Sequence, residues 1–244
     1  MTSCVTTFSK DGYELYGHKM IQTWLKFWPK SYKLIVYTEG YNLIEKDDRI
    51  IEYDLESVCP DLFSFKEKSF DLLKNETDKK NKNRIQKTIK WSHKVYAMNH
   101  ALNFKNDYLI FLDGDTYTIN NVDVDISQTL VKDHLMAVHF ETLKDGLHFE
   151  TGLIVFNLAH RQIQNLKDLL VSGYNNLDIY KMHKTWDGYW FAYLYKKYNL
   201  DVLDLSREGS GVFGNKNIKN ILKHDVGGGK YLRAGYNKFT GRKE

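Results

Sequence analysis

The sequence predicts an α/β fold with a mixed, mostly parallel central sheet and helices on both faces. The chain opens with an apolar, β-branched strand at residues 4–8, a helix at residues 13–28 that Pro29 ends, and a second strand at residues 33–38. Such a strand–helix–strand unit forms a parallel pair with a right-handed crossover. Later, residues 108–112 form an unbroken apolar run, which is typical of a strand buried on both faces of such a sheet.

The remaining elements follow from hydrophobic spacing and turn residues. Gly173 is expected to close the helix that precedes it, and Asp187 to cap the helix that it begins. Because no linker divides the chain, we expect one domain over residues 1–244. In chain order we expect a turn at 9–12, a strand at 49–53, one or two helices within 55–74, a polar loop at 75–84, a long helix at 85–104, strands at 134–140 and 151–158, helices at 159–173 and 187–198, and a short strand at 202–205.

The composition indicates a soluble protein that needs no disulfide or metal cross-links to fold. The net charge of +4 permits an anionic substrate or partner without requiring nucleic acid. Cys4 and Cys59 have no metal-type spacing and are expected to be reduced, buried thiols of an intracellular protein. No apolar run approaches the roughly 18 residues that a transmembrane helix needs. We therefore expect a cytoplasmic location, or the host cytoplasm if the chain is viral.

Asp113-Gly114-Asp115 directly follows the buried strand at residues 108–112. Ligands of open α/β sheets bind at the carboxyl ends of the strands, so both carboxylates are expected at a binding edge. Gly114 lets the backbone turn sharply and lets a bulky anion approach. Two hard oxygen ligands two residues apart suit a divalent ion such as Mn²⁺ or Mg²⁺. Taken alone, the tripeptide would favour a polar turn after a core strand, because Asp and Gly are common turn residues.

The first strand ends in Thr6, Thr7 and Phe8, and Tyr13 opens the next helix. Threonine hydroxyls and backbone groups could read the edge of a nucleoside base while Tyr13 stacks on its face, although a packed helix residue is the commoner role of such a tyrosine. Lys94 lies on the helix before the Asp-Gly-Asp strand. It could reach a diphosphate or sugar oxygen, or it could be a solvated helix lysine.

Two further groups of polar residues lie near predicted element ends. Glu150 and Asp187 are carboxylates that could bind sugar hydroxyls, although each would also suit an ordinary cap or turn. His224, Gly227 and Lys230 fall within one seven-residue segment, 224–230. Histidine is a metal ligand, the glycine-rich backbone can cradle phosphate with its N–H groups, and lysine adds a point charge.

Together, these motifs resemble the GT-A-fold (Rossmann-like) glycosyltransferases, most closely the retaining family-eight group of glycogenin-like and galactosyltransferase-like enzymes. That group has a Thr-rich first loop spaced before Asp-x-Tyr, an Asp-x-Asp metal strand, and a closing His-x-x-Gly-x-x-Lys. This chain departs from the group at Glu150-Thr151, where the group has Asn-Ser, and at Gly188, where it has Gln. It also has Tyr231-Leu232 where the group's closing motif continues with Pro-Trp. The matching residues are Val5-Thr6 through Asp11-Gly12-Tyr13, then Asp113-Gly114-Asp115, and finally His224, Gly227 and Lys230.

The resemblance implies a metal-dependent enzyme that moves a sugar from a nucleoside-diphosphate sugar, expected to be UDP-linked, to an acceptor hydroxyl with retention. It implies a nucleotide-sugar-binding part at about residues 1–120 and an acceptor- and sugar-binding part at about residues 121–244. The implied residues are Asp113, Asp115 and His224 for Mn²⁺ (or Mg²⁺), Thr6, Thr7, Phe8 and Tyr13 for the nucleoside, Asp113, Gly114, Gly227 and Lys230 for the donor's ribose and diphosphate, and Lys94, Glu150 and Asp187 as catalytic residues that position the sugar.

Two other functions fit the same residues. A nucleotidyltransferase that acts on sugar phosphates would use a similar sheet and metal carboxylates, but it usually has a Gly-rich basic loop after its first strand. A non-catalytic nucleotide-sugar-binding protein would keep the metal site as structure. The acceptor is expected to be a glycan or, given basic residues at 79–84 and near the C-terminus, a modified base in DNA.

Overall fold

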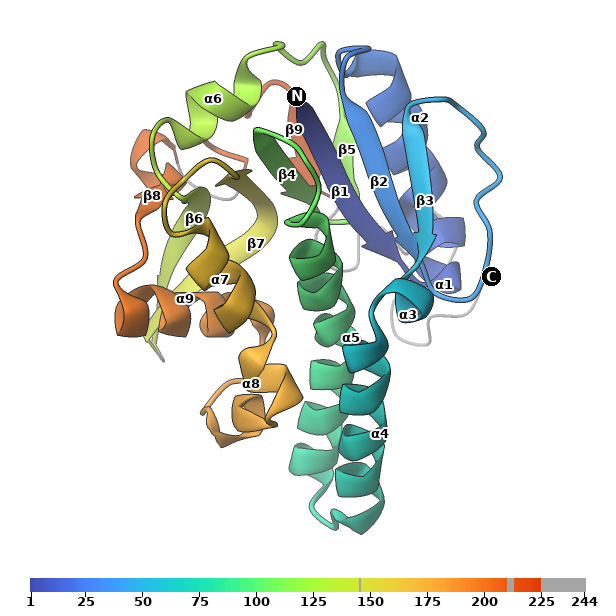
Figure 1. The fold of residues 1–244 in the computed structure, drawn as a ribbon, viewed down its shortest axis with the longest axis vertical. Coiled ribbons are helices and arrows are strands. Elements are labelled where there is room, and N and C mark those ends of the chain that lie inside the picture. Colours follow the sequence, from blue (N-terminus) through green and yellow to red (C-terminus); the bar gives the residue numbers. More distant parts are fainter. Residues whose placement is uncertain (145, 210–212, 225–244) are drawn as a thin grey trace.

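The computed structural model describes residues 1–144, 146–209 and 213–224. Its centre is a seven-stranded sheet with the strand order β3-β2-β1-β4-β7-β6-β8 (Figure 1). β7 runs antiparallel to β4 and β6, and the other neighbouring pairs are parallel, which confirms the predicted mixed sheet. The strands are β1 (Thr2–Phe8), β2 (Lys33–Thr38), β3 (Ile50–Asp54), β4 (Tyr108–Leu112), β6 (Met136–Leu143), β7 (Gly146–Asn157) and β8 (Val202–Asp204).

The segment after β1 is helical where the sequence predicts a turn. The Ser9 hydroxyl accepts the Gly12 N–H and caps α1 (Lys10–Gly12). This helix continues through one π-helical turn (Tyr13–Gly17) into α2 (His18–Phe27). The expected turn at residues 9–12 is therefore wrong. Serine is a strong N-cap residue, so the same polar residues also suit the first turn of a helix.

α4 (Pro60–Asn75) and α5 (Lys79–Ala101) form a hairpin that projects from the sheet (Figure 1). With the short α3 (Leu55–Val58), α4 confirms the predicted helices within residues 55–74. α5 begins six residues before its predicted start, so residues 79–84 are helical and not loop. The Asp78 carboxylate caps this start by accepting the Asn81 N–H at 2.8 Å, which lets a polar run begin a helix.

The helix predicted at residues 159–173 is shorter and ends differently. α7 covers only Ile163–Leu170, and Gly173 lies inside the next helix, α8 (Ser172–Asn175), rather than closing one. An ideal Cβ at Gly173 would lie 2.3 Å from the Trp190 ring, so packing requires this glycine. The other elements of this half are β5 (Thr116–Thr118), α6 (Ile126–Val131), a 3₁₀ turn at Asp178–Lys181, α9 (Asp187–Tyr198), a 3₁₀ turn at Leu205–Glu208 and β9 (Leu222–His224).

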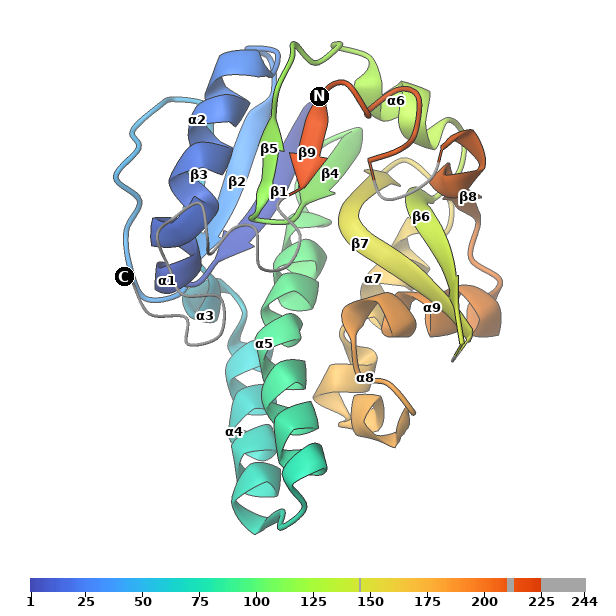
Figure 2. The ribbon, with the colours of Figure 1, turned by 180° about the vertical axis from the view of Figure 1, so that it is seen from behind.

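Two hydrophobic cores fill the two faces of the sheet. Val5 of β1 packs in one core with Val95 of α5, and Ile110 of β4 packs in the other with Trp24 of α2 and Leu130 of α6. Successive strand residues point to opposite faces, so both cores draw on the same strands. Figure 2 shows α2, β5 and β9 on the face away from α7. Within the described residues, no helix has both the length and the apolar character that crossing a lipid bilayer requires.

Gly173→Ala should lower the free energy of unfolding by about 1–3 kcal/mol, the usual cost of forcing a methyl group into a filled core. The methyl group would overlap the ring of Trp190, whose indole N–H donates to the Leu170 carbonyl at 2.8 Å. Urea unfolding measures the cost. In a Trp190→Leu background the same substitution should cost less, because the ring is gone. An equal loss of unfolding free energy in both backgrounds would show that the Trp190 ring is not the reason why position 173 requires glycine.

Candidate functional site: a carboxylate-rich cleft

A cleft of about 720 Å³ opens at the carboxyl ends of β1 and β4. Its lining includes Thr7 of β1, Asp113 after β4, Lys94 of α5 and Asp187 at the start of α9. The fold thus brings four segments that are far apart in the sequence to one edge of the sheet. This is the edge at which open α/β sheets bind their ligands.

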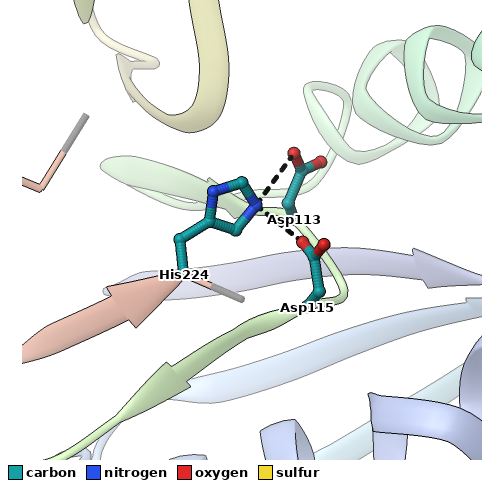
Figure 3. A group of neighbouring side chains, drawn as sticks. All are labelled: Asp113, Asp115 and His224. Carbon is teal, nitrogen blue, oxygen red and sulfur yellow. Dashed lines mark hydrogen bonds and ion pairs between the residues drawn. The ribbon is translucent and has the colours of Figure 1, made fainter. Parts of the chain in front are cut away.

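Three metal-ligating side chains meet at this edge. Asp113 follows β4 and Asp115 precedes β5, and the antiparallel pairing of β5 with β9 sets Thr116 opposite His224. The Nε2 atom of His224 lies 2.7 Å from Oδ1 of Asp115 and 4.0 Å from Oδ2 of Asp113 (Figure 3). One ligand atom from each of the three lies within 4.8 Å of the others. Two carboxylates and an imidazole at this spacing fit a divalent ion such as Mn²⁺.

Lys94 joins the metal-ligating carboxylates to α9. Its Nζ atom lies 2.7 Å from Oδ1 of Asp113 and 3.2 Å from Oδ2 of Asp187. It also donates a hydrogen bond to the Thr151 hydroxyl at 2.9 Å, and Thr151 donates to Asp187 at 2.7 Å. Only 12% of the Lys94 side chain is exposed, so it is a buried ion-pair partner and not a solvated helix lysine. Asp187 is the first residue of α9 and turns inward, and it makes no N-cap bond.

Burial and pairing act in opposite directions on the pKa values of these groups. Burial raises the pKa of Asp113, although the Lys94 ammonium opposes the rise. Burial raises the pKa of Glu150 too, and the nearby charge of Asp113 adds to it. Burial also acts to raise the pKa of Asp187, but the Lys94 ammonium and the hydrogen bond from Thr151 together outweigh it and leave the pKa below its ordinary value. The cleft therefore concentrates negative charge that a bound cation would relieve.

Glu150 faces the cleft with part of its carboxylate unused. One oxygen accepts the Gly152 N–H at 3.1 Å. The other makes no hydrogen bond or ion pair with the residues that the structure describes, so it is available to a ligand hydroxyl. Gly227 and Lys230, which we expected to contact phosphate, lie outside the described residues.

Of the three residues at the end of β1 that were expected to contact the nucleoside, only Thr7 faces the cleft. Thr7 lines the cleft, and its hydroxyl oxygen is buried without a hydrogen-bond partner among the described residues. Thr6 and Phe8 point to the opposite face of the sheet and are buried. The Phe8 ring would lie 2.7 Å from a Cβ at Gly114, so the backbone of Asp-Gly-Asp packs directly on this ring and only glycine fits.

Tyr13 lies in the core rather than in the cleft lining. Its ring stacks on Tyr41 with ring centres 5.3 Å apart, and its hydroxyl donates to Glu45. The expectation that it stacks on a base is not supported by this position. Tyr16 lines the cleft instead. The π-helical turn that contains both residues winds more residues into a turn than an α-helix does, which changes the side chains that reach the cleft.

Three aromatic side chains of the cleft were not selected from the sequence. Trp91 and Trp186 meet edge to face with ring centres 5.7 Å apart, and the His148 ring lies 6.1 Å from Trp186. His148 fills the space beside Gly188, where an ideal Cβ would lie 2.4 Å from its Nε2 atom. Trp91 could have been found from the sequence, because it lies three residues before Lys94 and therefore on the same helix face. No local pattern indicates His148.

Comparisons with known proteins identify the fold. No protein-family model matches the sequence, and no curated protein is similar to it. Its structure is similar to mouse xyloside xylosyltransferase 1, with a TM-score of 0.55 and 14% identity over 86% of this chain and 87% of that one. It is also similar to the bifunctional glycosyltransferase WbbM (TM-score 0.50, 14% identity, 100% of this chain and 46% of that one). A third similar structure is an active-site mutant of LgtC (TM-score 0.50, 15% identity, 85% and 74%). The chain therefore has the GT-A fold of glycosyltransferases, as its motifs predict, and spans just under half of WbbM.

Lys94→Met should lower the free energy of unfolding by about 3–5 kcal/mol at neutral pH, because it leaves two buried carboxylates without their cation. In the native protein the pKa of Asp187 is lowered, so its charge stabilises the fold at neutral pH and this contribution is lost as pH falls. Without Lys94, the burial of Asp187 is opposed only by its hydrogen bonds, such as the one from Thr151, and we expect burial to hold the carboxylate pKa values above those of the unfolded chain. The variant should therefore recover stability relative to the native protein as pH falls toward about 5.

Urea unfolding across this pH range measures the effect, with Lys90→Met as the matched control. Lys90 is exposed on the same helix, and its substitution should change stability by no more than about 0.5 kcal/mol. A penalty for Lys94→Met that stays constant with pH would contradict the charge-balancing role.

Proposed function

We propose that the protein is a metal-dependent glycosyltransferase, which moves a sugar from a nucleoside-diphosphate sugar to an acceptor hydroxyl. The observation that carries this proposal is the meeting of Asp113, Asp115 and His224 at the edge of the cleft of a GT-A fold. The similar structures named above are glycosyltransferases, which supports the same class. We infer Mn²⁺ rather than Mg²⁺, because Mg²⁺ is ordinarily held by oxygen ligands and water alone.

The residues around the ion-binding group have separate tasks in this proposal. A bound divalent ion would stabilise the negative charge of the departing diphosphate. Asp113, Asp115 and His224 hold that ion, and Gly227 and Lys230 contact the same phosphates, as the resemblance implies. The Thr7 hydroxyl, which has no hydrogen-bond partner among the described residues, supports a contact with the nucleoside, which we infer to be uridine.

The sugar-binding wall consists of Lys94, Glu150 and Asp187. Lys94 and Asp187 fix one another in a buried ion pair, so they present a rigid polar surface to a sugar ring. Glu150 offers its free oxygen to a sugar hydroxyl. Residues 1–120 then form the nucleotide-sugar part and residues 121–244 the part that completes the sugar and acceptor sites. We propose a cytoplasmic location for this activity.

We propose that transfer retains the anomeric configuration of the donor. The bond from the anomeric carbon to the diphosphate oxygen breaks, and the acceptor oxygen forms its bond on the face that the leaving group vacates. The acceptor proton passes to a departing phosphate oxygen. This step requires no side chain as an obligate base. Asp187 is paired with Lys94, Asp113 and Asp115 belong to the ion-binding group, and Glu150 offers its free oxygen to a sugar hydroxyl.

UDP should raise the melting temperature only when Mn²⁺ is present, because a ligand that binds the folded state stabilises it by mass action. Asp115→Asn and His224→Ala should each abolish this shift, whereas Asp133→Asn, an exposed aspartate away from the cleft, should leave it unchanged. A panel of nucleotides and nucleotide sugars with and without Mn²⁺ makes the measurement by scanning fluorimetry. A shift that survives both ligand substitutions, or no shift with any nucleoside diphosphate, would reject the proposed site.

Retention can be measured once a donor is identified. Proton NMR of the newly formed glycoside should show the anomeric coupling of the donor sugar at the earliest time points. Release of pyrophosphate from a nucleoside triphosphate and a sugar phosphate would instead identify a nucleotidyltransferase. The opposite anomer would leave the glycosyltransferase function standing and reject retention.

A further inference from the structure

The positive charge of the protein is concentrated in the α4–α5 hairpin. Residues 60–101 contain ten lysine and arginine residues against five aspartate and glutamate residues, a net charge of +5, while the whole chain carries +4. α5 itself contains six lysines and one arginine and no acidic residue. The rest of the chain is therefore close to neutral, and an anionic partner would be drawn to this hairpin.

Four exposed lysines of α5 form one stripe that leads into the cleft. We call Lys79, Lys80, Lys87 and Lys90 the lysine stripe. All four are exposed, and none of their side chains has an ion pair or hydrogen bond with the residues that the structure describes. Residues seven and eleven apart return to the same side of a helix, so the stripe continues to Lys94, which lies fourteen and fifteen residues after Lys80 and Lys79. At 1.5 Å per residue it is about 22 Å long. Lys90 and Lys94 both line the cleft.

The stripe is held at a fixed position relative to the site. The Arg84 guanidinium, on another side of α5, donates to the backbone carbonyls of Tyr180 and Met182. One turn later the Thr88 hydroxyl donates to Thr185 at 2.6 Å, two residues before Asp187. These bonds join the hairpin to the segment that leads into α9, so a chain bound along the stripe would enter the cleft at a defined angle.

The lysines at the start of α5 run against local helix preference. Lys79 and Lys80 lie in the first turn, where the helix dipole favours acidic side chains and disfavours cations. The Asp78 cap offsets part of this cost. Residues that break a local rule without a structural gain commonly serve function, which supports a binding role for the stripe.

Amide side chains, and not aromatic ones, lie between the lysines. Asn83 and Gln86 are exposed on the same side of α5 as the stripe, and Gln86 lines the cleft. Residues 79–90 contain no aromatic residue. Single-stranded nucleic acid is bound by cationic grooves with aromatic platforms for its bases, whereas amides and cations suit the hydroxyl and acidic groups of a sugar chain. The first aromatic residue of α5 is Trp91, inside the cleft.

We propose that the lysine stripe binds the acceptor, and that this acceptor is an acidic glycan whose end enters the cleft beside Lys90. The proposal rests on the glycosyltransferase function proposed above. The charged groups of the glycan, carboxylate, sulfate or phosphate, pair with the stripe outside the cleft, and Asn83 and Gln86 bond to its hydroxyls. The terminal sugar meets Trp91 and Trp186, whose apolar rings suit the faces of a sugar.

The test compares the native protein with a stripe variant that carries Lys79→Glu, Lys80→Glu and Lys87→Glu. A control variant carries Lys30→Glu, Lys105→Glu and Lys196→Glu, three exposed lysines outside the hairpin that change the net charge by the same amount. Glutamates in the first turn of α5 favour the helix dipole, so the stripe variant should fold. Circular dichroism and the melting temperature check the fold of both variants.

Fluorescence anisotropy with labelled oligogalacturonate and heparin fragments measures binding at several salt concentrations. The native protein should bind at least one of the two, more weakly as salt rises, and the stripe variant should bind about tenfold or more weaker, while the control variant changes by less than about threefold. Neutral dextran of the same length should not bind. Equal losses in both variants, equal binding of dextran, or no binding of either acidic probe would overturn the proposal.

Labelled oligodeoxythymidylate of matched length tests the alternative partner. Tighter binding of this oligonucleotide than of the acidic glycans, lost in the stripe variant, would assign the stripe to nucleic acid and reject an acidic glycan. UDP and Mn²⁺ stabilisation of the native protein is measured in parallel. A UDP shift without glycan binding rejects this inference alone, whereas glycan binding without any nucleotide shift rejects the proposed transferase.

Discussion

The ion pairs of Lys94 allow a cluster of carboxylates to exist at the edge of the sheet. Asp113, Asp115, Glu150 and Asp187 all line one cleft. The charges of Asp115 and Asp187 act to raise the pKa of Asp113, and the charge of Asp113 acts to raise that of Glu150. Lys94 contacts two of them directly and is itself largely buried. The charge balance of the cleft therefore depends on the position of α5, because a shift of this helix would remove the Lys94 cation from Asp113 and Asp187.

His224 depends on a second constraint, the pairing of two three-residue strands. β5 follows Asp115 by one residue, and β9 is the last described strand of the chain. Their register sets His224 against the Asp-Gly-Asp turn across more than a hundred residues of sequence. Since each strand is short, an ion shared by Asp113, Asp115 and His224 would add to the pairing of β5 with β9.

The sequence was most informative where a residue type has one dominant use. The buried strand before Asp113 follows from an apolar run, and the structure confirms it. Gly114 is required by the packing of the Phe8 ring, whereas the approach of an anion to it stays a prediction. Gly173 shows the limit of this logic: its helix-closing role was inferred from local rules, yet the ring of Trp190, seventeen residues away, decides it. Tyr13 and Tyr16 show another limit, because a π-helical turn has no clear sequence signal. The placement of His148 depends on tertiary packing alone.

The two charged regions of the molecule impose a direction on an acidic acceptor. Carboxylates line the inner cleft, and cations line the helix that leads to it. Lys79 lies about 22 Å along the helix from Lys94, more than twice the Debye length of about 8–10 Å in physiological salt. An acidic group held there is screened from the cleft carboxylates, whereas the same group inside the cleft would face them directly. An acidic chain would therefore be held with its charges on the stripe and an uncharged hydroxyl toward the reacting centre, which is the orientation that glycosyl transfer needs.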